Sequence, residues 1–405
     1  MTQADVLILG GGLVGGALAV ALDRHGITAI VVDPADPAVT LASGFDGRAS
    51  AVASASGRML DAIGIGSRIA GQGCAIRHIR VSDGLAPGKL DFIPDANDDA
   101  LGTMYENRLL RAAIFEAATA AGGIDLRMKR RAVHVDRTGA MVTATLDDGA
   151  IVGAPLLIAA EGRNSPTREA AGIKVARWSY DHAAIISAFN HQRDHENVAY
   201  EIFYPAGPFA LLPLNDDASG HRSAIVWSVH ARHGPAMLKL SDRAFMAEAE
   251  KRMGGFLGQL SNLSPRSSYP LGFHHAATIT GERLALVGDA AHGIHPIAGQ
   301  GLNLGFRDVA ALTQVLVEGK RLGLDLGDPA LLERYQRWRS LDTFMVAAAT
   351  DGLTRLFGIP GKAASAIRRF GISAVDKLPP LKERFMGEAR GESGDLPRLL
   401  QGEMV

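Results

Sequence analysis

The sequence predicts an α/β protein of two or three domains, on the basis of three observations. The chain has 405 residues, whereas a single domain commonly has about 150. Its first part reads as strand, glycine turn, helix and strand, the order of a parallel βαβ unit. Two later apolar runs, 155–160 and 283–287, have the composition of buried parallel strands and end in polar turns. These features together predict a parallel sheet covered by helices.

Composition excludes several classes of protein. Hydrophobic residues make up 47% and charged residues 21%, as in folded globular chains and unlike disordered ones. The 42 Lys and Arg balance 43 Asp and Glu to a net charge of -1, so no nucleic-acid partner is expected. Cys74 is the single cysteine, which excludes an intramolecular disulfide and a cysteine-cluster metal site and favours a cytoplasmic location.

The N-terminal glycine turn has the spacing of a dinucleotide-binding motif. An apolar strand over 4–9 ends in Gly-Gly-Gly-Leu-Val-Gly, and a helix is expected over 16–24. In such a turn the first glycine permits the sharp bend, the second lets backbone meet a pyrophosphate, and the third allows close helix–strand packing. The predicted cofactor contacts of this turn are Gly10, Gly12, Leu13, Val14 and Gly15.

A second strand over 28–32 ends at Asp33. This acid lies 18 positions beyond the last glycine of the turn, close to the spacing of about 20 for a carboxylate that binds an adenosine ribose. The motif alone does not choose between FAD and NAD, but its N-terminal place without a second copy favours a tightly held FAD. The apolar run over 6–22 is not a predicted membrane span, because Asp5 and Asp23 flank it and five glycines interrupt it.

A further motif, around residues 288–303, favours a flavin as the cofactor. Gly288 and Asp289 follow the strand over 283–287, where a carboxylate can accept hydrogen bonds from the polyol chain of a flavin. A glycine-rich run then leads into a helix expected over 304–316, whose amides and dipole can stabilise negative charge on a reduced flavin ring. The predicted contacts in this run are Gly299, Gln300, Gly301, Leu302 and Asn303, although Asn303 is equally a candidate helix N-cap.

These motifs occur in the order and spacing of the single-component FAD aromatic hydroxylases, which the chain resembles from about residue 4 to about 391. The run His-Pro-Ile-Ala-Gly-Gln-Gly-x-Asn-x-Gly-x-x-Asp, ending at Asp308, is similar to the signature of the ubiquinone-biosynthesis hydroxylases. The resemblance implies an FAD-binding Rossmann-like domain of the p-hydroxybenzoate hydroxylase type, an inserted mixed β-sheet substrate domain and a helical C-terminal segment. One departure is Glu161, which stands where the superfamily usually has Asp.

The resemblance also assigns roles to single residues. Arg48 and Asn107 match cofactor-contacting positions, and His295 and Pro296 fall in the loop expected at the reacting centre. His292 and His295 are not expected to bind a metal, because no carboxylate or cysteine pattern completes such a site. The candidate substrate contacts, for which an ordinary place in the sheet core is at least as well supported, are Tyr200, Phe209, Leu211 and Trp227.

The predicted FAD-binding domain comprises 1–75, 101–177 and 276–345, and the substrate domain comprises 76–100 and 178–275. Residues 346–405 form the C-terminal segment. Within it, 351–391 carries eight Lys or Arg and four acids among apolar residues. Such a segment either lies on an anionic membrane surface or packs its apolar side on the other domains.

The predicted function is hydroxylation of the aromatic ring of a polyprenylated phenol in ubiquinone biosynthesis. The resemblance implies FAD as cofactor, O2 as cosubstrate, a flavin hydroperoxide as the oxygen donor, and NAD(P)H or a protein reductant as electron donor. Other ubiquinone-biosynthesis proteins and the inner face of a membrane are the candidate partners. Two alternatives stay open: an FAD-dependent dehydrogenase or isoprenoid reductase, and a non-catalytic FAD-binding scaffold of a lipid-biosynthesis complex.

Overall fold

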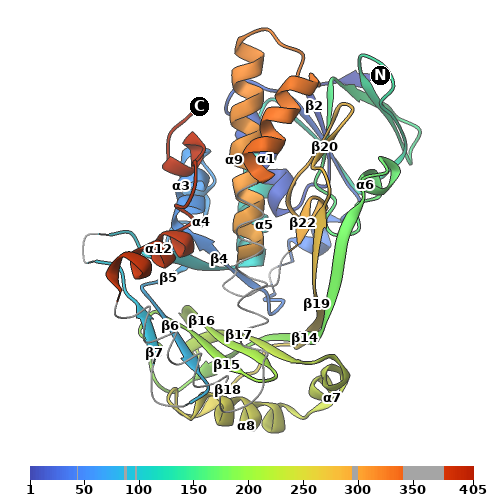
Figure 1. The fold of residues 1–405 in the computed structure, drawn as a ribbon. Helices are drawn as coiled ribbons and strands as arrows, with labels where there is room; N and C mark the ends of the chain where they lie inside the picture. Colours follow the sequence, from blue (N-terminus) through green and yellow to red (C-terminus); the bar gives the residue numbers. More distant parts are fainter. Residues whose placement is uncertain (43, 86–88, 96–97, 294–299, 341–377) are drawn as a thin grey trace.

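The computed structural model describes the chain except for residues 43, 86–88, 96–97, 294–299 and 341–377 (Figure 1). A six-stranded sheet, here called the parallel sheet, carries the N-terminal motif. Its order is β20 (Thr280–Gly281), β21 (Leu284–Leu286), β13 (Leu156–Ala159), β2 (Val6–Leu9), β3 (Ala29–Asp33) and β9 (Ile124–Met128). All pairs are parallel except that of β20 with β21. The predicted α/β class and the four predicted strands of this sheet are confirmed.

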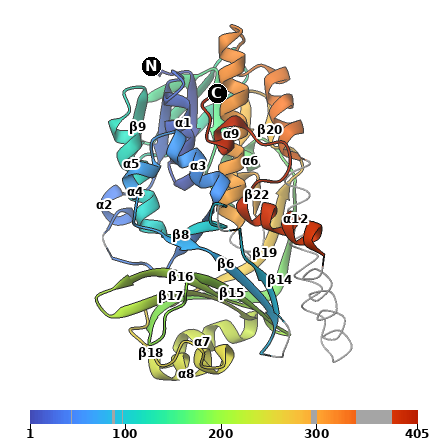
Figure 2. The same ribbon diagram turned by 90° about the vertical axis from the view of Figure 1, so that its left-hand side faces the viewer.

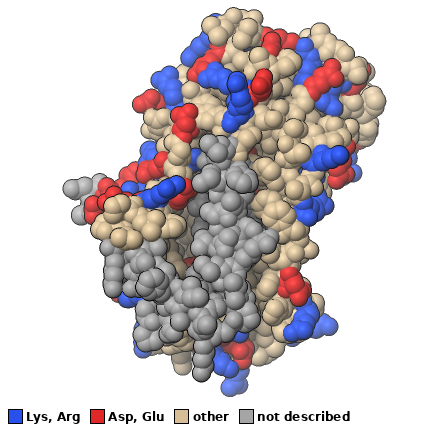
Figure 3. Space-filling model, in the orientation of Figure 1, with Lys and Arg blue, Asp and Glu red and all other residues tan. Residues whose placement is uncertain are grey.

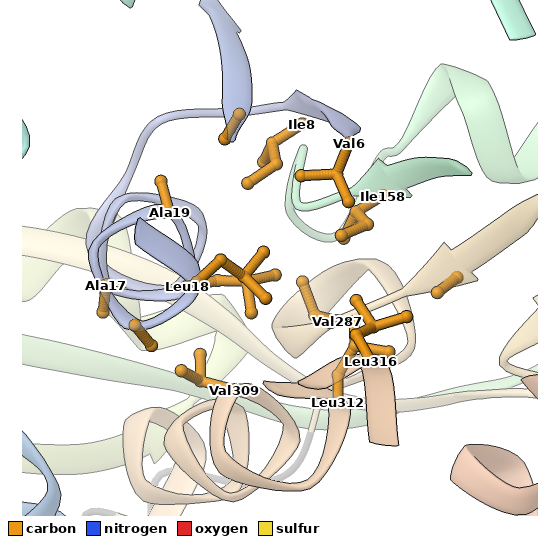
Figure 4. Close-up of a cluster of buried hydrophobic side chains, with 14 of the residues drawn as sticks. Val6, Ile8, Ala17, Leu18, Ala19, Ile158, Val287, Val309, Leu312 and Leu316 are labelled. Carbon is orange, nitrogen blue, oxygen red and sulfur yellow. The ribbon is translucent and has the colours of Figure 1, made fainter. Parts of the chain in front are cut away.

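Two helices pack together beside the parallel sheet. Helix α1 (Leu13–Asp23) begins directly after the glycine turn, and α9 (Gln300–Arg321) runs alongside it. Both helices begin a few residues earlier than the sequence predicted. Leu18 from α1 meets Val309 and Leu312 from α9 in a cluster that also contains Val6 and Ile158 of the strands (Figure 4). These side chains are fully buried, so the strand ends that carry the motifs are held rigidly.

Smaller elements complete this part of the molecule. Three strands form the small sheet: β4 (Ala49–Ala53), β8 (Gly102–Glu106) and β5 (Cys74–Ile76). Four others form an edge sheet: β1 (Thr2–Gln3), β12 (Ile151–Ala154), β11 (Val142–Leu146) and β10 (Ala132–Asp136). The helices are α2 (Pro37–Thr40), α3 (Ser54–Ala62), α4 (Gly66–Ile69), α5 (Asn107–Ala120), α6 (Pro166–Ala170) and α12 (Pro379–Arg390), with the short turns η2 (Gly288–Ala290) and η4 (Arg398–Gln401).

A nine-stranded mixed sheet, the large sheet, forms the other half of the molecule. Its order is β22 (His292–Gly293), β19 (Ser267–Ala276), β14 (Val175–His191), β17 (Gly220–His230), β16 (Gly207–Asp217), β15 (Val198–Tyr204), β6 (His78–Asp83) and β7 (Lys89–Phe92), with β18 (Leu260–Ser261) paired to β14. The pair β15–β6 is parallel and the others are antiparallel, which makes the sheet mixed, as predicted. The exact domain boundaries remain predictions.

Strand β14 is longer than the sequence indicated. The apolar run that indicates a strand in the sequence begins only at Ala183, whereas β14 begins at Val175 and has 17 residues. Its pairing with β19 shifts register between Ser179 and Ala183, so polar residues there interrupt the apolar pattern without ending the strand. Together β14 and β19 run as a long ribbon from the large sheet toward the parallel sheet (Figure 1).

The two faces of the large sheet have different neighbours. Helices α7 (Gly234–Lys239) and α8 (Asp242–Met253), with the turn η1 (Ala231–His233), lie against one face, and the small sheet lies on the side of the other (Figure 2). Side chains such as Ile202 join a core with Phe245 of α8. Side chains such as Ala199 join a core with Cys74 and Met104 of the small sheet. The second face therefore points toward the motif-bearing half of the molecule.

The surface matches the balanced composition. On the face seen in Figure 3, Lys and Arg side chains are interspersed with Asp and Glu among the described residues. No helix in the described ranges is both long and apolar enough to cross a membrane. The apolar run over 6–22 is divided between β2 and α1, in agreement with its rejection as a membrane span.

Candidate active site

The glycine turn has the shape that its spacing predicts. Gly10 has a φ of +103°, and a Cβ there would collide with the backbone of Ala160. A Cβ on Gly15 would collide with the carbonyl of Gly10, so this position needs glycine for close packing. A Cβ on Gly12 would meet no atom within 4 Å, and no side chain caps the helix that follows. The start of α1 is thus open to an anion, with the amides of Leu13 and Val14 in its first turn.

Asp33 lies at the carboxyl end of β3, next to the glycine turn. Its Oδ2 accepts a hydrogen bond from the amide of Gly11 at 2.6 Å, and its Oδ1 accepts one from the amide of Ala35 at 2.7 Å. Each carboxylate oxygen keeps capacity for a second hydrogen bond. Ribose binding by Asp33 remains a prediction, while the structure gives this carboxylate a second task, that of holding the turn in place.

Asp289 follows β21 in the short turn η2. Its side chain is exposed, and its carboxylate has no hydrogen-bond partner or ion pair among the described residues. The protein packed around it raises its pKa, although His292 and Arg163 oppose this shift. The backbone carbonyl of Asp289 accepts a hydrogen bond from Nε2 of His274 at 2.7 Å, which fixes the turn. The carboxylate is therefore available to bind hydroxyl groups of a ligand.

Asp308 is the buried centre of the turn around Gly288. Its Oδ2 lies 2.8 Å from the Gly288 amide and 2.7 Å from Nε2 of His292, and its Oδ1 accepts from Nε of Arg339 at 2.7 Å. Burial opposes ionisation of this fully buried acid, but His292 and Arg339 bring its pKa below the ordinary value. Asp308 ends the sequence run that is similar to the hydroxylase signature, but no sequence pattern indicated that Arg339 is its partner.

Asn303 links the start of α9 to the small sheet. Its Oδ1 accepts from the amide of Ala53 at 2.8 Å, and its Nδ2 donates to the carbonyl of Ala51 at 2.8 Å. Helix α9 begins at Gln300, so Asn303 lies inside the helix, and the reading of Asn303 as an N-cap was wrong. A Cβ on Gly301 would meet no atom within 4 Å, and Leu302 packs partly on the core. The predicted residues His295, Pro296 and Gly299 lie outside the described residues, as does the side chain of Gln300.

Arg48 and Asn107, predicted from widely separated segments, lie next to each other. The amide of Asn107 donates to the carbonyl of Arg48 at 3.0 Å, and Oδ1 of Asn107 accepts from Oγ of Ser50 at 2.7 Å. The Arg48 side chain is half-exposed, with its guanidinium 5.5 Å from the ring centre of Tyr269. Within the described part of the chain, Nδ2 of Asn107 has no partner, so it is available to donate to a bound group.

The four candidate substrate contacts lie on the other face of the large sheet. Their packing neighbours include Phe245, Ala249 and Met253 of α8, and the four residues are Tyr200, Phe209, Leu211 and Trp227. Phe209 is fully buried there, with its ring centre 5.3 Å from that of Trp227. This packing does not support their prediction as substrate contacts. Side chains alternate along a strand, so the face that points toward the flavin motifs carries the neighbours of these four residues instead.

Two further features bear on the predictions. Oε2 of Glu161 accepts from Oγ of Ser165 at 2.6 Å and from the amide of Thr167 at 3.2 Å, at the start of α6. The longer carboxylate at this position therefore serves the local turn. No group of three or more His, Cys, Asp or Glu that could hold a metal occurs among the described residues.

These residues fit a flavin dinucleotide. The space beside Gly12 and the open start of α1 suit a pyrophosphate. The carboxylate of Asp289, which has no partner among the described residues, suits the hydroxyls of a ribityl chain. The Nδ2 group of Asn107 adds a neutral hydrogen-bond donor, and the half-exposed guanidinium of Arg48 adds a positively charged one. Bound in this way, the group would supply redox chemistry, and the protein would supply its position and charge environment.

A pair of alanine substitutions tests this fit. Gly12→Ala adds a methyl group where no protein atom lies, so we expect the apoprotein to keep its Tm while FAD binding weakens at least tenfold. Gly15→Ala forces the Gly10 carbonyl to move, so we expect it to lower the Tm of the apoprotein as well. Flavin titration and thermal unfolding of both variants would check this. Unchanged FAD affinity in Gly12→Ala would show that no pyrophosphate lies against this glycine.

Comparisons with known proteins support FAD as the cofactor. Residues 3–347 match the family model described as FAD binding domain. The chain is 44% identical over 402 residues to the ubiquinone hydroxylase UbiL of Rhodospirillum rubrum, covering 98% of this chain and 93% of that protein. It is 32% identical over 389 residues to the 3-demethoxyubiquinol 3-hydroxylase of Escherichia coli, covering 96% and 98%. Among solved structures, p-nitrophenol 4-monooxygenase of Pseudomonas putida shares the fold with a TM-score of 0.79 at 18% identity, covering 98% of this chain and 100% of that one.

Proposed function

Because the chain belongs to the FAD-dependent hydroxylases of ubiquinone biosynthesis, we propose that it hydroxylates the aromatic ring of a polyprenylated phenol. The enzyme is an FAD-dependent monooxygenase. The comparisons do not favour the alternatives of an FAD-dependent dehydrogenase, an isoprenoid reductase or a non-catalytic scaffold. The prenylated phenol as substrate is the finer part of the proposal, and the ubiquinone-related names of the relatives support it.

The proposed reaction balances with one external reductant. One atom of O2 replaces a ring hydrogen as a hydroxyl group, and the other atom leaves as water. Two electrons and two protons are required, and we assign them to NAD(P)H or a reduced protein, with FAD as the relay. The chain's own tasks are to hold the cofactor, to place the ring beside it and to keep water from the reacting centre.

The observation that supports this reaction best is the arrangement around the end of β21. Asp289 offers a carboxylate that no described residue engages, and the Asp308 network fixes the turn that carries it. The open start of α1 and the hydrogen-bond donors of Arg48 and Asn107 belong to the same half of the molecule. His295 and Pro296 stay proposed residues of the reacting centre, and His295 is assigned to substrate placement rather than proton transfer.

A single-turnover experiment tests the proposed function. The flavin of the purified protein is reduced chemically without oxygen, ortho-prenylphenol is added, and oxygen is then admitted. We expect a product whose mass exceeds that of the substrate by one oxygen atom, and we expect its yield to fall at least tenfold in Asp289→Ala. Reoxidation of the flavin without any ring product, for this and longer prenylphenols, would contradict the proposal.

The cellular setting is also proposed. A substrate with a polyprenyl chain is sparingly soluble in water, which supports peripheral contact with the inner face of the membrane or with other ubiquinone-biosynthesis proteins. Most of the basic segment over 351–391 lies outside the described residues, but α12 presents an exposed Phe385. Co-sedimentation with anionic vesicles tests the membrane contact, and protein that stays in the supernatant would contradict it.

A further inference from the structure

One carboxylate on the large sheet has no hydrogen-bond or ion-pair partner among the residues that the structure describes. Glu201 lies in β15 between Tyr200 and Ile202, whose side chains point toward α8. Because side chains alternate along a strand, Glu201 points to the opposite face, together with Ala199 and Phe203. Ala199 packs with residues of the small sheet, which shows that this face points toward the half of the molecule that carries the flavin motifs.

The neighbours of Glu201 on that face are apolar. In the register of the sheet, Glu201 lies opposite Val81 of β6 on one side and Ala210 of β16 on the other. The same row continues through Val226 of β17 to Ile186 of β14. Val81, Val226 and Ile186 are partly exposed, so they present an apolar surface with one carboxyl group in it.

Glu201 has no hydrogen bond or ion pair with any described residue, and burial raises its pKa to about 8. An unpartnered carboxyl in apolar surroundings is unfavourable for stability, and natural proteins keep such groups mainly where they serve binding or catalysis. The structure thus places the carboxyl of Glu201 in a row of apolar side chains, with Asp83 diagonally across from it on β6. A mainly apolar surface with a few polar groups is the usual composition of a site for a small organic ligand.

We propose that Glu201 anchors the aromatic substrate by hydrogen-bonding its ring hydroxyl, while the apolar row beside it contacts the ring and the first isoprene unit. This inference rests on the proposed function and names the group that recognises the phenol. A protonated carboxyl can both donate to and accept from a phenolic hydroxyl, so the pair forms without placing a net charge in apolar surroundings. Fixing the hydroxyl also fixes which ring carbon faces the cofactor, since a hydroxyl activates only the positions ortho and para to it.

A binding experiment with two probes separates anchoring from a merely structural role. Calorimetric titration of the FAD-loaded protein compares ortho-prenylphenol with prenylbenzene, which lacks only the hydroxyl. We expect the wild-type protein to bind the phenol about tenfold more tightly than prenylbenzene, which is the difference in affinity that one well-made hydrogen bond provides. Glu201→Met, which nearly keeps side-chain length, should bind both probes equally, with its affinity for prenylbenzene unchanged. Glu201→Gln, which can still hydrogen-bond, should recover part of the preference and serves as a second variant if Glu201→Met does not fold.

The control is Glu248→Gln, because Glu248 is exposed on α8, across the sheet from Glu201. This variant should keep the full preference for the phenol. A tenfold preference retained in Glu201→Met would overturn the anchoring role and leave the proposed function standing. A wild-type protein that binds neither probe would contradict the proposed function itself, and the anchoring role with it.

Discussion

Replacing Asp308 by Asn is expected to lower the free energy of unfolding by about 3 kcal/mol or more, since it removes the charged partner of Arg339 in a buried ion pair. The charge of Arg339 then faces a neutral amide, and an amide nitrogen in place of Oδ2 cannot accept from Gly288. Because the same turn carries Asp289, we also expect the purified variant to retain less FAD. Thermal unfolding and the ratio of flavin to protein absorbance measure the two effects.

The sign of the pH dependence follows from the lowered pKa of Asp308. A carboxyl with a folded-state pKa below the unfolded value of about 3.9 stabilises the protein above that value and loses this contribution as pH falls through the folded pKa. Asp308→Asn lacks this contribution to stability, so the difference in stability between wild type and variant should shrink as the pH falls. Asp98→Asn, in the more exposed ion pair with Arg390, is the matched control and should cost less than about 1 kcal/mol. Equal losses in the two variants would show that the buried network is not what holds the turn.

Replacing Glu201 by Gln is expected to stabilise the protein at alkaline pH. The folded protein holds a proton on Glu201 up to pH about 8, whereas the unfolded chain releases it near pH 4.3. Stability therefore falls as pH rises between these values, and glutamine removes the titration. Allowing for the partial exposure of Glu201, we expect Glu201→Gln to be more stable than the wild type by about 2 kcal/mol at pH 9 and nearly equal to it at pH 5.

Other charged or titratable groups on the same face of the sheet include Asp83 of β6, Arg222 and His230 of β17, and Tyr269 of β19. They remain in the variant, so their contributions cancel in the comparison. Thermal unfolding of both proteins across this pH range measures the difference. A constant difference in Tm at all pH values would show that Glu201 does not titrate in this way. A gain in stability combined with weaker phenol binding would agree with a residue kept for function.

Local patterns predicted the motif-bearing half of the fold well. The strands at β2, β3, β13 and β21 are continuous apolar runs, and each ends in a polar or glycine turn that sequence periodicity detects. The full length of β14 was less predictable. Its interior contains exposed polar residues around the register shift near Ser179, and only pairing with β19 reveals that the strand continues.

The sequence could predict site residues only where their role depends on neighbouring residues of the chain. Gly10 and Gly15 follow from backbone sterics, but the tie of Asn303 to β4 joins positions 250 residues apart. Which face of the large sheet points toward the flavin motifs is a tertiary property, and β15 contains suitable residues on both. Residue type therefore favoured the aromatic Tyr200 as a substrate contact, whereas the proposal of Glu201 depends on the alternation of side chains between the two faces.

The origin of the inserted oxygen tests the central claim most directly. The reduced protein with bound prenylphenol is mixed with heavy-isotope O2 in ordinary water, and the product is analysed by mass spectrometry. Insertion by a monooxygenase predicts that the new ring hydroxyl carries the heavy isotope in proportion to the gas. A hydroxyl with the isotope composition of the water would contradict oxygen insertion and indicate dehydrogenation followed by addition of water.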